Sequence, residues 1–212
     1  MTYETERLTF RPWRMDDAEE LYTLAADEHV GPPCGWLPHV CLDETKSILE
    51  RILINDHKFC FIDKTSGRII GNIGIDDVHD PEMLERLKKE AEEKAKEPMY
   101  SEPEEMTNKP AEFGAEIRNK KPALLEKELG FWVGYPYWNK GYMTEAVLGT
   151  IDYCFDVLGL TRIWCGNFSD NPASGHVQEK CGFKYEYTRN EFSQQLGKEV
   201  EIITRSIERK TT

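Results

Sequence analysis

The spacing of apolar residues predicts regular structure at both ends of the chain. Leu8 and Phe10 alternate with polar residues, which is typical of a half-buried strand. A helix is expected next, with Asp16 or Asp17 as its N-cap. A second helix is predicted over residues 42–55, after a Gly- and Pro-rich loop. Its buried stripe is expected to be Ile48, Leu49, Ile52 and Leu53.

Two β-rich runs then predict a hairpin, because residues 58–63 and 68–78 are separated only by the turn sequence KTSG. The pattern changes after them. Residues 80–97 carry Glu and Lys at i,i+4 spacing, which favours an exposed helix of low intrinsic stability. An acidic loop is expected to follow. We interpret residues 79–125 as a charged insertion within a single domain that spans residues 1–212.

Regular patterns return at residue 126 and predict the order β-α-β-α-β-β for the rest of the chain. A strand over 126–134 precedes a long helix from about Thr144 to Leu158, whose periodic apolar residues form one face. The remaining predicted elements are a strand at 161–167, a helix at 171–181 and strands at 183–188 and 200–207. This mixture of helices and strands indicates an α+β fold.

Composition restricts the possible partners. The formal net charge is −12, so a phosphate backbone would meet no clustered basic surface, and we expect no nucleic-acid partner. Without a signal peptide or a long apolar run, a cytoplasmic protein with no membrane partner is expected. The cysteines lack metal-site spacing and are expected to be reduced and mostly buried. They are Cys34, Cys41, Cys60, Cys154, Cys165 and Cys181.

Several catalytic motifs are absent. The sequence contains no P-loop, dinucleotide-binding glycine motif, nucleophile elbow or HExxH zinc motif. The run GNIG at residues 71–74 lies inside a predicted strand, where it is poorly placed to bind phosphate. The histidines share no helix face, so no catalytic metal is expected.

The sequence GYPYWNKGYMTEA, residues 134–146, joins a predicted strand to a predicted helix. The first N–H groups of a helix have no partner and carry partial positive charge, so such a turn can hold an anion. Gly141 permits close approach of the backbone and Lys140 adds a full charge. An ordinary helix start with an exposed lysine is the alternative that this turn alone leaves open.

The motifs around this turn resemble those of the GNAT acetyltransferases, and most closely their RimJ/RimL-like branch. The resemblance rests on Trp132, followed by WNKGYMTEA at 138–146, and on a strand that ends at Asn167. It also includes SDNPAS at 169–174 and KCGF at 180–183. The amino-terminal segment TERLTFRPWRMDDAEEL is similar to the opening signature of the same branch.

The resemblance implies the GNAT fold, in which a mixed, mostly antiparallel and twisted sheet is splayed in the middle and flanked by helices on both faces. The splay is expected between residues 129–133 and 162–166. Acetyl-CoA is the implied cosubstrate, bound at the strand edge and on the turn, with no metal. The implied binding residues are Phe131, Trp132, Val133, Asn139, Lys140, Gly141, Tyr142, Met143, Thr144, Asn171 and Ser174.

Two departures from the family pattern concern the site. Asn139 stands where the general pattern has glycine, which is acceptable if its φ is negative, and Met143 replaces a small residue. Many members also carry a catalytic tyrosine seven residues after the asparagine, but Gln178 occupies that position. Ser174 is then the implied donor to the CoA sulfur. Helix capping is the alternative role for Ser174, and a simple N-cap is the alternative for Asn171.

The implied reaction is direct attack of an amine on the thioester, which needs a base and a donor to the developing oxyanion. The amide of Val133 or a neighbour is the expected donor. Glu128 is the first candidate for the base, with Glu116 and Asp76 behind it. Glu145 is expected to serve the helix N-terminus instead. Rings of Trp36, Trp132 and Tyr137 are candidate walls of the acceptor site, although a core role is the favoured alternative.

The acceptor is predicted to be a protein N-terminus or a small cationic amine. The loops at residues 31–39 and 189–199 are expected to border it. The insertion is a candidate contact for a partner or for a second subunit of a homodimer, against the favoured alternative of a solvated appendage. Two hypotheses of other classes remain, namely a catalytically silent acyl-CoA-binding module and an interaction protein that works through the insertion.

Overall fold

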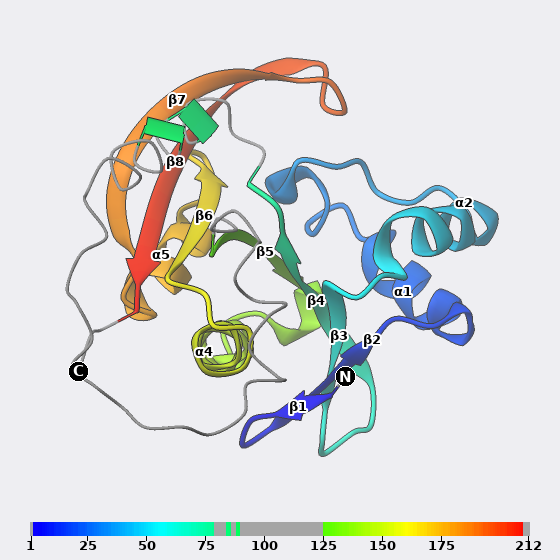
Figure 1. Cartoon of the computed structure of the whole chain (residues 1–212). Helices are drawn as coiled ribbons and strands as arrows, with labels where there is room; N and C mark the ends of the chain where they lie inside the picture. The colour runs from blue at the N-terminus through cyan, green and yellow to red at the C-terminus, as the bar shows by residue number, and fades with distance from the viewer. Residues whose placement is uncertain (1, 79–83, 86–87, 90–124, 210–212) are drawn as a thin grey trace, which may run out of the picture. The chain divides into compact units, whose positions relative to one another are not determined.

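The computed structural model describes residues 2–78, 84–85, 88–89 and 125–209 (Figure 1). The chain divides into two units, Met1–Asp77 with Glu126–Thr212, and Val78–Leu125. The second unit corresponds to the predicted charged insertion, and most of it, including Glu116, lies outside the described residues. Where that segment is described, residues 84–85 and 88–89 are helical, and Glu85 pairs with Lys89 at 3.9 Å as the i,i+4 spacing predicts.

The first unit is built on an eight-stranded sheet of order β1-β2-β3-β4-β5-β6-β8-β7. Neighbouring strands are antiparallel except β5 and β6, which are parallel. This confirms the mixed, mostly antiparallel α+β fold. The strands are β1 Tyr3–Glu4, β2 Leu8–Pro12, β3 Lys58–Asp63, β4 Ile69–Asp76, β5 Glu126–Val133, β6 Arg162–Phe168, β7 Lys184–Ser193 and β8 Lys198–Glu208.

The helices agree with the apolar periodicity except near their ends. They are α1 Ala18–Ala25, α2 Leu42–Ile48, α4 Tyr142–Asp152 and α5 Pro172–Lys180. The predicted burial of Ile52 is wrong, since its side chain is 50% exposed. The reason is that the chain after α2 forms a π-helical turn, Leu49–Leu53, which changes the angular position of each later residue. Helix α4 begins at Tyr142, two residues before the predicted Thr144.

Helices cover both faces of the sheet, as expected. Successive side chains of a strand face opposite sides, so the strand residues alternate between two apolar clusters, one under the helices of each face. Phe59 and Phe61 of β3 join a cluster with Met143 and Val147 of α4. Cys60, between them, joins a second cluster with residues of α1 and α2. Below, the two faces are called the α4 side and the α1 side of the sheet (Figure 1).

The predicted splay lies between β5 and β6. The parallel pairing covers only three positions, from Glu126 opposite Arg162 to Glu128 opposite Trp164. Beyond Glu128, β5 continues to Val133 and stays paired with β4 on its other side. Strand β6 continues to Phe168 and stays paired with β8. The two strands are therefore each supported from outside while they separate from one another.

Candidate functional site

The splayed part of β5 directs backbone groups away from β4. The N–H of Gly134 donates to the carbonyl of Ile70 at 2.8 Å, and the register between the two strands is constant from there to Glu128. Hydrogen-bonded and non-bonded pairs alternate along an antiparallel ladder. The N–H groups of Phe131 and Val133 therefore point toward the side where pairing with β6 has ended. An extended ligand inserted there would find backbone donors already aligned.

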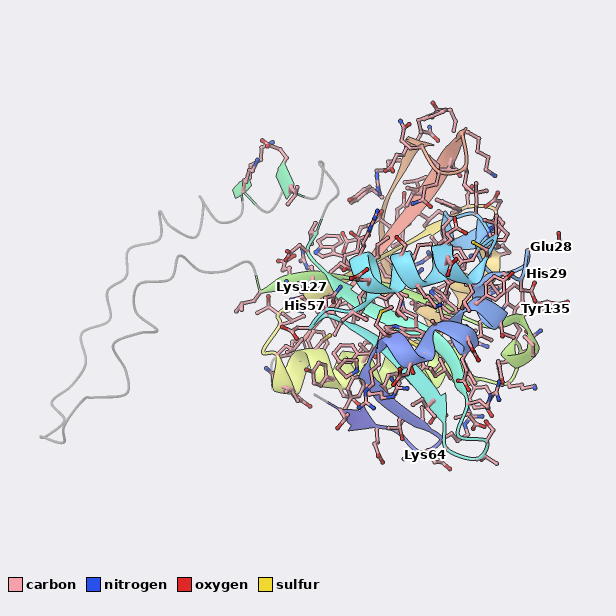
Figure 2. All side chains as sticks on the ribbon, turned by 90° about the vertical axis from the view of Figure 1, so that its right-hand side faces the viewer. Glu28, His29, His57, Lys64, Lys127 and Tyr135 are labelled. Carbon is pink, nitrogen blue, oxygen red and sulfur yellow. The ribbon has the colours of Figure 1, made fainter. Side chains whose placement is uncertain are left out.

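Aromatic contacts hold the segment that leaves β5. The indole N–H of Trp138 donates to the carbonyl of Val133 at 2.8 Å, which leaves the Val133 N–H as the available group of that residue. Trp138 also meets the ring of Tyr135 edge to face at 5.1 Å. Tyr135 in turn stacks on His29, beyond the end of α1, with ring centroids 4.2 Å apart (Figure 2). The turn is thus fixed on both sides before α4 begins.

The turn into α4 contains two left-handed residues. Asn139 has φ 58° and Gly141 has φ 77°. Asparagine at position 139 was expected to replace glycine acceptably only if its φ were negative, and that condition is wrong. The substitution is acceptable for a different reason. Asparagine is among the few non-glycine residues that adopt the left-handed region readily, because its short amide side chain can bond locally. The turn thus keeps a conformation that glycine would otherwise supply.

The start of α4 presents unpaired backbone donors. Its first helical bond runs from the N–H of Glu145 to the carbonyl of Gly141 at 3.1 Å, so the N–H groups of Tyr142, Met143 and Thr144 have no partner within the helix. The Met143 side chain is buried among the α4-side apolar residues. Its bulk is therefore directed into the core and leaves its N–H at the surface of the turn. The side chain of Lys140 is exposed and lies 5.7 Å from the centre of the Tyr137 ring.

A clamp from the amino terminus holds this turn. The Nε of Arg7 donates to the Glu145 carboxylate at 2.5 Å, and its Nη1 donates to the Lys140 carbonyl at 3.0 Å. The same carboxylate accepts from the Thr5 hydroxyl at 2.6 Å and from the Arg7 N–H at 2.7 Å. Burial alone would raise the pKa of the Glu145 carboxyl, but these hydrogen bonds outweigh it and lower the pKa.

Thr5 and Arg7 were missed as site residues by sequence reasoning, although both belong to the amino-terminal signature that carries the resemblance. Nothing in their spacing shows that residues about 140 positions apart meet. Glu145 does serve the helix N-terminus, as expected, but chiefly by joining it to the β1–β2 turn. The guanidinium of Arg7 also lies over the Tyr142 ring, 4.5 Å from its centre.

Helix α5 places Asn171 and Ser174 at the end of β6. The Asn171 side chain caps the helix by accepting from the Ser174 N–H at 3.2 Å, so the alternative N-cap role is present. Its amide group also donates to the Pro33 carbonyl at 3.0 Å, which attaches the loop after α1 to α5. The Ser174 hydroxyl accepts a hydrogen bond from Gln178 at 3.3 Å. A binding role for Asn171 stays a prediction.

Glu128 lies at the last paired position before the splay. Its Oε1 is 4.0 Å from the point that a Cβ on Gly166 would occupy, so the carboxylate reaches across to β6. Burial raises the pKa of the Cys165 thiol, and the nearby Glu128 carboxylate adds to this rise. Asp76, the reserve candidate for the base, is opposite Glu128 on β4 but pairs with Lys58 at 2.7 Å. That ion pair makes Asp76 the weaker candidate.

Glu128 and Ser174 lie on opposite faces of the sheet. Successive residues of a strand face opposite sides. Cys165 belongs to the α4-side cluster, so Gly166, beside the Glu128 carboxylate, faces the α1 side. Asn167 faces the α4 side again and accepts from Gln178, the partner of Ser174. The two candidate catalytic groups therefore approach the splay from its two sides.

Two of the three candidate acceptor-site rings come together on the α1 side. Trp36 and Trp132 make an edge contact with ring centroids 5.9 Å apart, and both pack against the α1-side cluster. Tyr137 packs against the clusters on both faces and makes no printed ring contact with the two tryptophans; its ring contacts Tyr142 instead, with centroids 6.2 Å apart. Most of the predicted loop at 189–199 is strand, since β7 extends to Ser193 and β8 begins at Lys198. The sequence did not predict these strand ends, because residues 189–199 are mostly polar and resemble a loop in composition.

A groove runs along α4 from Gly141 and Thr144 toward Asp152. Its lining includes Glu4, Glu6 and Asp156, as well as Lys180. A carboxylate-rich lining repels phosphate, so we do not include this groove in the anion site.

Within the described ranges, no cluster of His, Cys, Asp and Glu is arranged to hold a metal ion. No helix in that part of the chain is long and apolar enough to cross a membrane. The cysteines are free thiols, of which Cys60, Cys154, Cys165 and Cys181 are buried, while Cys34 and Cys41 are exposed. This agrees with the expectation that most of the cysteines are reduced and buried.

Residues 7–94 and 103–184 match the protein family described as "Acetyltransferase (GNAT) domain". The N-acetyltransferase p20 of Bacillus licheniformis is 22% identical over 208 residues, which are 95% of this chain and 92% of p20. The N-acetyltransferase YoaA of Bacillus subtilis is 33% identical over 79 residues, which are 35% of this chain and 45% of YoaA. That match therefore spans less than half of YoaA.

Solved structures with the same fold cover nearly the whole chain. A GNAT-family acetyltransferase from Bacillus anthracis has a TM-score of 0.69 at 19% identity, covering 98% of each chain. A ribosomal-protein-S5-alanine acetyltransferase from Vibrio fischeri has a TM-score of 0.63 at 19% identity, covering 98% of this chain and 96% of its own. Spermidine N-acetyltransferase from Vibrio cholerae, in complex with CoA and spermine, has 0.63 at 15% identity, covering 96% of each.

Proposed function

The chain belongs to the GNAT family of acetyl-CoA-dependent acyltransferases, and we propose that it transfers an acetyl group from acetyl-CoA to a primary amine. One observation carries the proposal. The N–H groups of Phe131 and Val133 point into the splay between β5 and β6, beside a helix start with unpaired donors. This arrangement suits a ligand that combines an amide-bearing chain with phosphates.

The residues present fit acetyl-CoA, which supplies the acetyl group as a thioester when bound. The left-handed turn at Asn139 and Gly141 exposes the N–H groups of the first turn of α4. Lys140 adds a positive charge, and a helix N-terminus favours anions. The pyrophosphate is proposed to lie on residues Asn139 to Thr144. The backbone of Phe131 to Val133 is proposed to bind the pantetheine, with Asn171 at its far side.

The chemistry is proposed to divide between the two faces of the sheet. An amine with a lysine-like pKa of about 10.4 arrives mostly protonated. Glu128, on the α1 side, takes its proton directly or through water. A backbone N–H of the splayed part of β5, from Val133 or a neighbour, is proposed to stabilise the negative charge that develops on the carbonyl oxygen. Ser174, on the α4 side, donates its hydroxyl hydrogen to the departing sulfur.

The acceptor is proposed to be a protein N-terminus or a small cationic amine, in the manner of the RimJ/RimL-like branch. The net charge of −12 suits a cation. Neighbours by fold include an enzyme named for a ribosomal-protein alanine and one named for spermidine, so both classes of amine are represented among them. The contacting rings of Trp36 and Trp132, on the same side as Glu128, are proposed to border the acceptor.

The alternatives are less well supported. The matched family and the relatives are acetyltransferases, so a catalytically silent CoA-binding module is not favoured. The single-domain organisation, the homodimer and a contact role for the insertion at 79–125 stay proposals. Removal of residues 80–110 tests the last of them, because loss of partner binding with intact CoA binding would assign the insertion a contact role.

An acceptor screen tests the proposed function. Purified protein and acetyl-CoA are incubated with peptides that carry free N-termini, with polyamines and with aminoglycosides. Free thiol is measured, and products are identified by mass spectrometry. We expect thiol release that depends on the acceptor and a product heavier by one acetyl group. Binding of CoA without such release from any amine would favour the silent module.

A further inference from the structure

The buried side chain of Gln178 occupies the position where many family members carry a tyrosine, and it contacts the candidate donor Ser174. It lies one turn after Ser174 on α5 and has no exposed surface. Its Nε2 is 3.3 Å from the Ser174 hydroxyl and 3.3 Å from the Asn167 side-chain oxygen. A buried amide that touches the proposed donor can control where the hydroxyl hydrogen points.

The direction of each hydrogen bond in this group is set by Arg205. An arginine side chain can only donate. The Nη1 of Arg205 lies 2.7 Å from the Asn167 Oδ1, so that oxygen must be the acceptor. The other end of the Asn167 amide donates to the Phe168 carbonyl at 2.7 Å, which is consistent with this orientation. Asn167 is therefore oriented by groups whose own roles are unambiguous.

The orientation of Asn167 fixes the orientation of Gln178. Only the NH₂ group of Gln178 can face an oxygen that already accepts from Arg205, because an Oε1 there would meet Oδ1 without a hydrogen. The second hydrogen of the same NH₂ group is directed at Ser174. The Ser174 oxygen is thus an acceptor in this contact, and its own hydrogen must point away from Gln178. Its backbone N–H is already satisfied by Asn171.

From this chain of contacts we infer that Gln178 is a positioning residue, which holds the Ser174 hydroxyl so that its hydrogen is directed outward to the CoA sulfur. The inference rests on the proposed function, since it needs CoA beside α5. Arg205 and Asn167 form the support behind Gln178, and Arg205 is itself held by Glu179 at 3.0 Å. Gln178 touches neither reactant and acts only through Ser174.

The cost of this arrangement supports a role beyond packing. The Gln178 Oε1 is buried and has no hydrogen-bond partner among the described residues. A buried acceptor without a partner loses its hydrogen bonds to water and gains none in return, which is unfavourable. Methionine would fill a similar volume without that cost. Packing alone therefore does not explain an amide at this position, whereas orientation of Ser174 does.

The thiol pKa of bound CoA provides a test that needs no knowledge of the acceptor. A hydrogen bond donated to a thiolate lowers the pKa of the thiol. Titration of the protein–CoA complex is followed by the ultraviolet absorbance of the thiolate, for the wild type, Ser174→Ala, Gln178→Met, Gln178→Glu and the double variant Ser174→Ala/Gln178→Met. We expect Ser174→Ala to raise the thiol pKa by about one, equal to a tenfold change in the ionisation constant.

Gln178→Met is expected to raise the thiol pKa in the same direction, because the Ser174 hydroxyl is then free to rotate. Gln178→Glu should have the larger effect, since a carboxylate would accept the Ser174 hydrogen and turn it inward. The double variant should match Ser174→Ala within about a factor of two in the ionisation constant, which is the usual scatter when the effects of two substitutions are compared. Ser206→Ala, which removes a partly buried side-chain hydrogen bond on β8, is the control and should leave the thiol pKa unchanged.

The outcomes separate the inference from the proposed function. If the wild type does not bind CoA, both are overturned. If Ser174→Ala raises the thiol pKa but Gln178→Met leaves it at the wild-type value, only the inference is overturned. Additive effects in the double variant would also overturn it, because Gln178 would then act independently of Ser174. If Gln178→Glu does not fold, Gln178→Met and its double variant still decide between these outcomes.

Discussion

The guanidinium of Arg7 and the carboxylate of Glu145 form an ion pair, with the Arg7 Nε 2.5 Å from the Glu145 Oε2. Arg7 also donates to the Lys140 carbonyl at 3.0 Å. One side chain from the β1–β2 turn thus holds both the first turn of α4 and the loop before it. The proposed anion site is therefore shaped by Arg7, which precedes Glu145 by 138 positions in the sequence.

Replacement of Arg7 by alanine should loosen this turn. A hydrogen bond to a charged group contributes about 1.5 to 3 kcal/mol, and solvent screening at a partly exposed site reduces this. We therefore expect the free energy of unfolding to fall by about 1 to 2 kcal/mol. Binding of CoA should weaken as well. Urea unfolding and calorimetric titration measure the two effects. Arg209→Ala, which removes a more exposed pair with Asp156, is the matched control and should change neither.

The clamp should also make stability depend on pH. The pKa of the Glu145 carboxyl is lowered in the folded state, so its contribution is complete above the unfolded value of about 4.3 and is lost as the pH falls through the folded value. Glu145→Gln should therefore be less stable than the wild type at neutral pH, and the difference should shrink below about pH 4. Urea unfolding across this range checks it, and a constant difference would contradict the assignment.

The left-handed turn gives a prediction about CoA binding. Gly141→Val should weaken binding and destabilise the fold, because a branched side chain is strained at φ 77°. Lys140→Glu should weaken binding with little change in stability, since its side chain is exposed. Asn139→Gly, which retains the left-handed conformation, should preserve both properties. Unchanged CoA affinity in the first two variants would remove the turn from the proposed site.

Ser174→Ala should lower turnover while leaving CoA affinity almost unchanged. The hydroxyl is proposed to act on the sulfur only as negative charge develops there. A hydrogen bond to a charged group contributes about 1.5 to 3 kcal/mol, which corresponds to a roughly ten- to hundredfold lower kcat. Steady-state kinetics with an acceptor from the screen would measure it. Normal turnover would instead leave Ser174 with a structural role in the first turn of α5.

The fold could be predicted closely because local patterns and one resemblance agreed. Alternation identified β3 and β4, and the motif order implied the splay between β5 and β6, which the strand pairing confirms. The errors have local physical causes. Ile52 was placed in the core because a π-helical turn cannot be read from a 3.6-residue period. The condition set for Asn139, a negative φ, was wrong because asparagine also adopts the left-handed region, as it does in this turn.

The candidate site could be predicted only where its residues are close together in the sequence. The turn at 139–144 and Ser174 lie within short motifs, and they follow the carboxyl ends of the parallel strands β5 and β6. Arg7 could not be found in this way, because its contact with Glu145 depends on how the sheet brings β1 and β2 beside α4. Gln178 was noted only as a missing tyrosine, since its bonds to Ser174 and Asn167 exist only once α5 is folded against β6.

The last prediction concerns the base. If Glu128 accepts the proton of the amine, Glu128→Gln should lower kcat by about a hundredfold or more, which is the usual contribution of general base catalysis. It should also remove the acidic limb of the kcat/KM profile, because the group whose ionisation produces that limb is gone. Asp76→Asn is the matched control on the neighbouring strand and should keep the acidic limb, since Asp76 is held by Lys58.

Glu116→Gln tests the third candidate in the same assay. Loss of the limb in Asp76→Asn or Glu116→Gln, with its retention in Glu128→Gln, would transfer the role of base to that residue. The proposed division between the two faces of the sheet would then need a different group on the α1 side, because Glu128 is the candidate whose carboxylate reaches β6 where the strands separate.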